Sequence, residues 1–319
     1  MSSFTLGIDV GGSKIAYGVF HKHHLLRRLE HPTRAERSSA EILHEIKTVV
    51  HNIVAQESEE GRSLAGIGMA FPSYIDYERG HILFTSAITS LRDIPVRRIF
   101  EMEFACPVRL DNDCNVAALA ELRKGAGRGL RNFLYCAVST GIANGIIIDG
   151  KVFRGSYGAA GETGHMLITP EQGLRCGCGN QGCFMSYASG GMIVKHICER
   201  LKAGEKSLMT ELCHGDLQQI SGPVLHKAAL QGDKLALSAV DQMSKYLGIW
   251  LYNIYACFNI NCFIFGGGLV HFGELLFRPV RETFDRYNQS FRNYPVEFKF
   301  AELKQDFGII GAELLLQET

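Results

Sequence analysis

Apolar residues alternate with other residues on both sides of a glycine-rich turn near the start of the chain. The alternation runs through residues 4–10, stops at Gly11-Gly12-Ser13-Lys14, and resumes through residues 15–20. A period of two is typical of β-strands, and two glycines between such strands are typical of a hairpin. A second segment of strand, glycine-containing turn and strand begins at Tyr135 and ends at Gly150. The pattern therefore predicts a distant internal repeat.

The rest of the chain alternates between helical and strand-like patterns. Apolar residues spaced by three and four predict helices at residues 39–57, 115–124, 240–258, 272–287 and 307–317, and short apolar runs predict strands at residues 65–70, 108–110 and 262–265. These elements predict an α/β protein, and we expect the last helix to return to the first domain.

Length and composition fit two medium-sized domains. The chain has 319 residues, of which 46% are hydrophobic, so each domain can build its own core. The pattern places a boundary near residue 115, with residues 1–115 and about 305–319 in a small domain and residues 116–304 in a larger one. Because 33 Lys and Arg balance 33 Asp and Glu, a nucleic-acid partner is disfavoured.

The sequence predicts a cytoplasmic protein without a membrane span. The N-terminal residues lack the basic and apolar segments of a signal peptide and lead directly into a strand-like pattern. Residues 247–265 carry no charge but contain Asn253, Asn259 and Asn261, whose amides are costly in lipid. We expect a buried helix and a buried strand there.

The first glycine turn carries groups that suit a phosphate. Asp9-Val-Gly11-Gly12-Ser13-Lys14 places backbone N–H groups, a hydroxyl and an ammonium after a carboxylate that can reach Mg²⁺. An ordinary Gly-Gly hairpin explains this segment alone equally well. The turn Ser139-Thr140-Gly141 and the triplet Gly266-Gly267-Gly268 also follow strands, and three such turns favour a nucleotide, with the helix after Gly268 offering its N-terminus.

Asp111-Asn112-Asp113 stands where a predicted strand meets a predicted helix. Asp and Asn at the start of a helix accept hydrogen bonds from its free backbone N–H groups and stabilise the helix by about 1 kcal/mol. Such capping explains the presence of Asp111 or Asn115 as well as a functional role does. An acid at the end of a strand also suits a general base, and an adjacent Asn can hold a hydroxyl group. Spacing leaves both interpretations open.

Three of the ten cysteines fall within eight residues, shortly after a histidine. One imidazole and three thiolates complete a closed tetrahedral Zn²⁺ site, so we expect a structural zinc held by His165, Cys176, Cys178 and Cys183. Glycines at positions 177, 179 and 182 let the backbone wrap around it. The zinc should shape the segment that carries Glu162, and we interpret the other seven cysteines as small core residues.

Together these residues resemble the ROK family of repressors, uncharacterised reading frames and sugar kinases. The segments that carry the resemblance are Asp9-Val-Gly-Gly-Ser-Lys14, Phe71-Pro-Ser73-Tyr-Ile-Asp76, Asp111-Asn-Asp-Cys-Asn115, Ser139-Thr-Gly141, Gly158-Ala-Ala-Gly-Glu-Thr-Gly-His165, Gly266-Gly-Gly268 and Asp306-Phe-Gly-Ile-Ile-Gly311. The resemblance runs nearly end to end. It implies an actin-like ATPase (ribonuclease H-like) fold, with a mixed sheet in each of two domains and an interdomain cleft.

The resemblance also implies roles for individual residues. Asp113 would be the catalytic base that takes a proton from a sugar hydroxyl. The sugar would be held by Ser73, Asn112, Asp113, Glu162 and His165, with one ring nitrogen of His165 on the zinc and the other on the sugar. ATP and Mg²⁺ would be bound by Asp9, Gly11, Gly12, Ser13, Lys14, Ser139, Thr140, Gly141, Gly267 and Gly268. A homodimer is the assembly that the family implies.

Several positions depart from the family pattern. The motif Gly-Cys-x-Glu is here Gly182-Cys-Phe-Met185, so a sugar-binding carboxylate is replaced by a thioether that accepts hydrogen bonds only weakly. Ser73 replaces a glycine of the sugar loop, and Ser139 and Ala143-Asn144 interrupt the glycines of the second turn, where a side chain could crowd the phosphates or the sugar. The pattern does not choose among glucose, fructose, allose, N-acetylglucosamine and N-acetylmannosamine.

Two classes of function follow from this resemblance. The first is an ATP-dependent kinase acting on a hydroxyl, expected to be O6, of a hexose or N-acetylhexosamine. The second is a sugar-sensing regulator or a sugar-binding protein with weak turnover, which the loss of the carboxylate at Met185 would favour. ROK repressors carry a winged-helix domain before the sugar fold, and with the phosphate turn at residue 9 we expect no room for one.

Overall fold

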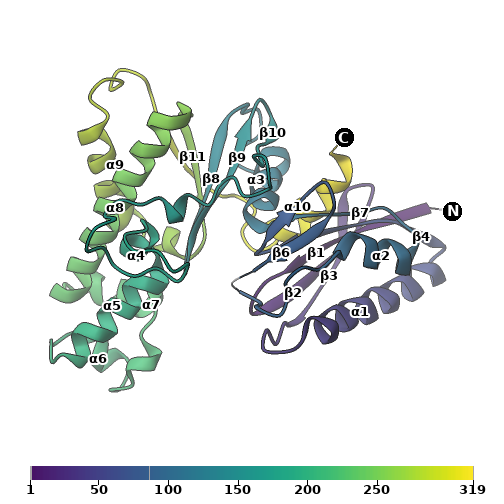
Figure 1. Cartoon of the computed structure of the whole chain (residues 1–319), viewed down its shortest axis with the longest axis horizontal. Helices are drawn as coiled ribbons and strands as arrows, with labels where there is room; N and C mark the ends of the chain where they lie inside the picture. Colours follow the sequence, from purple (N-terminus) through teal and green to yellow (C-terminus); the bar gives the residue numbers. More distant parts are fainter. Residues whose placement is uncertain (1, 86, 319) are drawn as a thin grey trace. The chain divides into compact units, whose positions relative to one another are not determined.

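The computed structural model describes residues 2–85 and 87–318 and divides them into two compact units (Figure 1). Unit 1 contains the chain up to Arg131, Gly145–Gly161 and the chain from Ala301 onward. Unit 2 contains Asn132–Asn144 and Glu162–Phe300. The sequence placed a boundary near residue 115. The difference arises because helix α3 (Asp113–Lys124) packs on helix α10 (Phe307–Leu314), which covers the first sheet.

The sheet of unit 1 has the order β3-β2-β1-β4-β7. Its strands are β1 (Ser2–Val10), β2 (Lys14–His21), β3 (His24–Pro32), β4 (Arg62–Phe71) and β7 (Val108–Asn112). The predicted hairpin is confirmed, since β1 and β2 pair antiparallel, whereas β1, β4 and β7 run parallel. The register aligns Asp9 with Ala70 and Ala70 with Asp111, so both acids lie at the carboxyl edge of the parallel strands.

Helices cover both faces of this sheet. On one face, α1 (Ser39–Glu59) and α2 (Val96–Phe104) contribute apolar side chains to a core with β1 and β4. On the other face, α10 contacts β1, β2 and β4, so the last helix returns to the first unit as predicted. A Cβ added at Gly7 or Gly68 would overlap the backbone of α10, so these two glycines permit its close approach. A small hairpin of β5 (Tyr74–Asp76) and β6 (His81–Phe84) completes the unit.

A second sheet has the order β10-β9-β8-β11-β12. Its strands are β8 (Phe133–Val138), β9 (Ile142–Ile148), β10 (Lys151–Val152), β11 (Cys262–Gly266) and β12 (Glu297–Phe300), and the division between the units passes through β9. The parallel pairs are β8 with β11 and β11 with β12. The second sheet is therefore mixed, like the sheet of unit 1.

Unit 2 is rich in helices. They are α4 (Met185–Ala188), α5 (Gly190–Lys202), α6 (Leu208–Leu212), α7 (Gly222–Leu230), α8 (Lys234–Phe258) and α9 (Glu274–Tyr287), with 3₁₀ turns at Thr163–His165, Leu217–Gln219 and Gly268–Phe272, and a further one in unit 1 at Leu315–Gln317. The turn after Gly267 is therefore a 3₁₀ helix, and α9 begins only at Glu274. Trp250 of α8 is fully buried and stacks on Phe184 at 5.0 Å.

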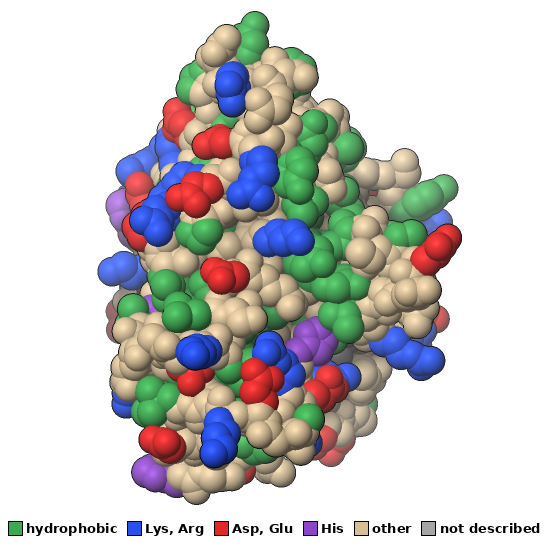
Figure 2. All heavy atoms as spheres, turned by 90° about the vertical axis from the view of Figure 1, so that its left-hand side faces the viewer, with side chains coloured by type: hydrophobic (Ala, Val, Ile, Leu, Met, Phe, Trp, Pro, Cys, Tyr) green, Lys and Arg blue, Asp and Glu red, His purple; other side chains and the backbone are tan. Residues whose placement is uncertain are grey.

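The uncharged stretch at residues 247–265 forms the end of α8 and strand β11, as predicted. Among the described residues, the structure has no helix with the length and apolarity needed to span a membrane. Lys and Arg side chains lie interspersed with Asp and Glu on the face shown in Figure 2. The prediction that all seven remaining cysteines are core residues is wrong for two of them, since Cys257 is exposed and Cys198 is only half-buried.

Candidate functional site

The first glycine turn is held from outside by a threonine that the sequence did not single out. Within the turn, the Gly11 N–H donates to the Lys14 carbonyl at 2.9 Å. Thr33 is fully buried, and its hydroxyl donates to the Gly11 carbonyl at 2.6 Å while its N–H donates to the Ser13 carbonyl at 3.0 Å. Thr33 follows the edge strand β3, so only the folded structure reveals this contact.

The Asp9 carboxylate lies beside this turn in a half-buried position. Burial raises the pKa of Asp9 to about 6, and the positive charges of Lys14 and Arg28 oppose that shift. A Cβ added at Gly308, in the first turn of α10, would overlap the carboxylate. Lys14 itself forms an ion pair with Glu30 at 3.0 Å. The turn therefore combines a carboxylate whose pKa is raised to about 6 with a lysine already paired to an acid.

The corner between β7 and α3 brings three predicted residues together in unit 1. Asn112 caps α3, because its side-chain oxygen accepts from the N–H groups of Cys114 at 2.8 Å and Asn115 at 3.4 Å. Its amide donates to the Ser73 carbonyl at 3.2 Å, and the Asp113 carboxylate accepts from the Cys114 N–H at 2.9 Å. Ser73, Asn112 and Asp113 are thus neighbours, and the helix cap is Asn112 rather than Asp111 or Asn115.

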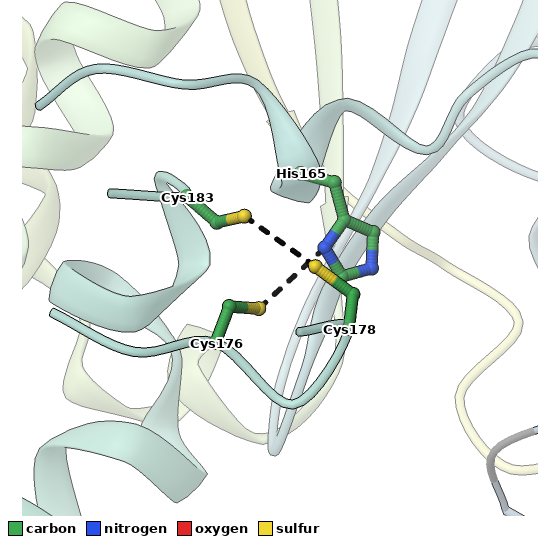
Figure 3. Close-up of side chains that lie close together, drawn as sticks. All are labelled: His165, Cys176, Cys178 and Cys183. Atoms are coloured by element: carbon green, nitrogen blue, oxygen red, sulfur yellow. Dashed lines mark hydrogen bonds between the residues drawn. The ribbon is translucent and has the colours of Figure 1, made fainter. Parts of the chain in front are cut away.

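The four predicted metal ligands converge in unit 2 (Figure 3). Their ligand atoms all lie within 4.8 Å of one another. The Cys178 and Cys183 sulfurs are 3.6 Å apart, as are the Cys176 sulfur and His165 Nδ1. A tetrahedral zinc with bonds of about 2.0–2.3 Å requires ligand separations of roughly 3.3–3.8 Å, so these two separations and the chemistry of the donors are compatible with zinc.

The backbone around this cluster shows which glycines the wrapping requires. Gly179 and Gly182 have φ of 94° and 77°, a conformation that favours glycine, and a Cβ at Gly182 would also overlap the Thr169 carbonyl. Gly177 has no positive φ, and a Cβ there would meet no atom within 4 Å. The expectation that glycine is needed at position 177 is therefore wrong, while positions 179 and 182 behave as predicted.

His165 presents its two nitrogens to different groups. Nδ1 faces the cysteine cluster, and Nε2 lies 4.0 Å from a Glu162 carboxylate oxygen. Both side chains are 30% exposed, so each is partly accessible from solvent. Within unit 2, the structure thus brings Glu162 next to His165, which itself belongs to the metal cluster.

The second glycine turn lies against the start of α5. The Ser139 and Thr140 carbonyls accept from the N–H groups of Gly190 at 2.8 Å and Gly191 at 3.1 Å. A Cβ at Gly267, which has φ of 94°, would lie 2.6 Å from the Val138 carbonyl oxygen. The turn at residues 139–141 and the triplet at residues 266–268 are therefore adjacent. Sequence reasoning missed Gly190-Gly191, although the pair follows a helix-capping serine.

Two of the departures from the family pattern occupy different environments. Asn144 is 1% exposed, and its amide bonds to the Tyr135 carbonyl and to Thr163, so it faces the interior of unit 2 rather than crowding a ligand. Met185 is half-buried. A Cβ added at Gly141 would be 3.7 Å from its Cε, and one at Gly164 would be 3.5 Å from its Cβ. Residue 185 therefore lies between the second turn and the Glu162 segment.

The two mixed sheets with their helices have the actin-like ATPase fold, which solved structures of ROK kinases share. A ROK family glucokinase from Streptomyces griseus, solved in complex with glucose and AMPPNP, superposes with a TM-score of 0.81 at 32% identity, covering 99% of this chain and 100% of that one. The fold class predicted from the sequence is confirmed.

Sequence comparison gives the family. The ROK family model matches residues 5–319, and the chain belongs to this family. A glucokinase of Halalkalibacterium halodurans is 32% identical over 314 residues, covering 98% of this chain and 94% of that protein. A xylose repressor of Caldicellulosiruptor bescii is 28% identical over 263 residues, covering 82% of this chain and 65% of the repressor. The kinase relatives support the predicted enzyme class, a carbohydrate kinase.

Proposed function

We propose that the chain is an ATP-dependent kinase that phosphorylates a hydroxyl, expected to be O6, of a hexose or N-acetylhexosamine. The observation that carries this proposal is the corner at residues 111–113. It places an acid and an amide next to Ser73, at the carboxyl edge of parallel strands, where ligands of open α/β sheets commonly bind. Glucokinases at 32% identity support the same reaction.

Phosphoryl transfer from ATP would use both glycine turns. In this proposal the phosphates contact Asp9, Gly11, Gly12, Ser13 and Lys14, and the triphosphate and nucleoside contact Ser139, Thr140, Gly141, Gly267 and Gly268. The AMPPNP complex of the Streptomyces griseus relative supports a nucleotide in this role. When bound, Mg²⁺ would offset charge on the β- and γ-phosphates, and in this proposal the Asp9 carboxylate would hold it.

The sugar would be positioned by polar groups from several segments. Asn112, Ser73, Glu162 and His165 would orient the ring, and Asp113 would accept the proton of the attacking hydroxyl. Because phosphoryl transfer requires little covalent chemistry from the protein, holding the hydroxyl in line with the γ-phosphoryl group is the main contribution of these residues. In this proposal zinc stays structural and holds His165 in place.

A coupled ADP-release assay over hexoses and N-acetylhexosamines tests this function. We expect sugar-dependent ADP release with at least one sugar, and loss of that release with the matching 6-deoxy sugar. Turnover that survives removal of O6 would contradict the position of transfer. ADP release without dependence on any sugar would contradict the kinase itself.

The alternative is a sugar-binding regulator, which the similarity to the xylose repressor and the thioether at Met185 favour. Under this alternative a sugar raises the Tm of the protein without any turnover of ATP. The family resemblance also leads us to propose a cytoplasmic homodimer. Light scattering in solution would test the dimer, and a monomer at micromolar concentration would contradict it.

The raised pKa of Asp9 predicts that kcat/KM for MgATP depends on pH. The Asp9 pKa of about 6 means that the carboxyl is protonated below that pH and ionised above it. Since only the ionised form can hold Mg²⁺, kcat/KM for MgATP should fall as the pH drops below about 6, by about tenfold per unit at the limit. We expect a flat profile over this range in Asp9→Asn. An equally steep fall in the variant would assign the titration to another group.

Replacing Met185 by glutamate tests whether this residue affects sugar affinity. If sugar hydroxyls lack a carboxylate partner here, Met185→Glu should tighten binding of a common hexose by about 1.5–3 kcal/mol, the value of one charge-assisted hydrogen bond. If Met185 packs against an apolar face of an unusual sugar, the buried carboxylate should weaken binding of that sugar. Calorimetric titration with the same sugar panel separates these results.

Met102→Glu is the matched control, because Met102 is 76% exposed on α2 in unit 1. It should leave every sugar affinity unchanged. If Met185→Glu also changes no affinity, residue 185 lies outside the sugar site, and this part of the proposal fails.

A further inference from the structure

A buried ion pair lies directly behind the corner that carries Asp113. Asp111, on β7 two residues before Asp113, is 2% exposed, and its Oδ2 accepts from Arg154 Nε at 2.7 Å. Its Oδ1 accepts from the Asn115 side chain at 3.0 Å and from the Asn112 N–H at 2.7 Å. Both oxygens of the Asp111 carboxylate therefore accept hydrogen bonds, and two of the three donors, Asn112 and Asn115, lie at the cap and in the first turn of α3.

Arg154 connects this corner to two other segments of unit 1. Its guanidinium also donates to the Glu318 carboxylate and lies 3.7 Å from the centroid of the Tyr77 ring. The Tyr77 hydroxyl donates to the same Glu318 carboxylate at 3.2 Å. The Arg154 side chain is only 17% exposed, so these contacts hold it in one place. One side chain thus joins β7, the segment after β5 and the last turn of the chain.

Charge explains why the arginine is needed at this position. Burial raises the pKa of Asp111, and the positive charge of Arg154 opposes that shift. Removing the cation would leave a buried carboxylate without its counter-ion, which is unfavourable, so the carboxyl must rotate, take up a proton or admit water. Each of these changes disturbs the bond from Asp111 to the Asn112 N–H. Asn112 is the cap of α3, and Asp113 is the first residue of that helix.

We propose that Arg154 is a positioning residue for Asp113. By holding the Asp111 carboxylate, Arg154 fixes the backbone at the end of β7 and thereby the orientation of the Asp113 side chain. The inference rests on the proposed role of Asp113 as base. Arg154 acts through Asp111 and Asn112. A displacement of about 1 Å in a reacting group can cost 10²-fold in rate, so a pair that holds the backbone of the corner can control kcat.

The test compares four variants of the full chain and one control variant with wild type in the ADP-release assay. We expect Arg154→Met to lower kcat about 10²-fold with KM for ATP within about twofold, because the glycine turns are not in this network. Arg154→Lys keeps the charge but replaces the planar guanidinium by a single ammonium group. Its kcat should therefore lie between those of wild type and Arg154→Met. It also serves as the informative variant if Arg154→Met does not fold.

The double variant Asp111→Asn with Arg154→Met tests whether the two residues act as a pair. Asp111→Asn is also measured alone. The double variant removes both charges together, so its kcat should fall less than the product of the losses in Asp111→Asn and Arg154→Met predicts. Arg131→Met is the matched control. Arg131 pairs with Asp149 at 2.8 Å in the same unit, but its side chain is 79% exposed, and kcat should not change.

The outcomes separate this inference from the proposed function. Wild-type kcat in both folded Arg154 variants, with only a lower Tm, would overturn the inference, since that pattern belongs to a purely structural pair. A rise in KM for ATP without a change in kcat would overturn it as well. Absence of turnover in the wild type with every sugar would instead contradict the proposed kinase, and the positioning role would fall with it.

Discussion

Replacing Asp113 by asparagine is expected to lower kcat by about 10²–10⁴-fold, the usual contribution of a positioned general base. The amide keeps the shape of the side chain and a side-chain oxygen that can still accept from the Cys114 N–H, as Asp113 does at 2.9 Å. It has no basic oxygen for the proton of a sugar hydroxyl. The Tm of the variant should therefore stay close to that of wild type while turnover is lost.

Asp149→Asn is the control for this experiment. Asp149 is an exposed acid in a turn of unit 1 with φ of 51°, a conformation that asparagine tolerates well. Its replacement should change neither kcat nor Tm. If Asp113→Asn retains near wild-type turnover, Asp113 is part of the helix start only, and the base must be sought elsewhere.

Replacing Cys178 by serine is expected to remove zinc and to lower both stability and sugar binding. Wild type should carry one zinc per chain, because His165, Cys176, Cys178 and Cys183 form a closed set. Binding free energy at a structural zinc site contributes directly to folding. A loss of several kcal/mol corresponds to a Tm lower by roughly 10 °C in a domain of this size.

The matched control is Cys257→Ser, because both cysteines are exposed and only Cys178 lies in the cluster. Cys257→Ser should keep the zinc, the Tm and the sugar affinity. Elemental analysis that finds no zinc in metal-replete wild type would contradict the metal site. Full sugar affinity in a zinc-free Cys178→Ser protein would separate the metal from the segment that carries Glu162 and His165.

The parts of the fold that the sequence predicted correctly are those with strong local patterns. The first hairpin, α1, α8 and the metal cluster each depend on residues close together in the chain. Strand β3 was missed because it is an edge strand whose residues 24–32 are mostly half-buried or exposed, which weakens the alternation. With β3 unrecognised, the hydrogen bonds of Thr33 to the first glycine turn could not be predicted either.

The unpredicted parts of the site depend on contacts between distant segments. Arg154 stands alone in a loop, and it pairs with Asp111, 43 residues earlier, only in the folded chain. The sequence offered Asp111 or Asn115 as the cap of α3, and spacing could not single out Asn112, because Asp and Asn both cap helices well. The placement of α3 in unit 1 likewise follows from its packing on α10 and not from any pattern within α3.

The most direct test of the proposed kinase is to detect the phosphorylated sugar itself. Zinc-replete wild type is incubated with MgATP and each sugar of the panel, and mass spectrometry follows the products, with Asp113→Asn in parallel. The account predicts a hexose or N-acetylhexosamine monophosphate formed in equal amount to ADP by the wild type, and about 10²–10⁴-fold more slowly by the variant. Sugar binding that raises the Tm of wild type while no sugar phosphate forms would contradict it.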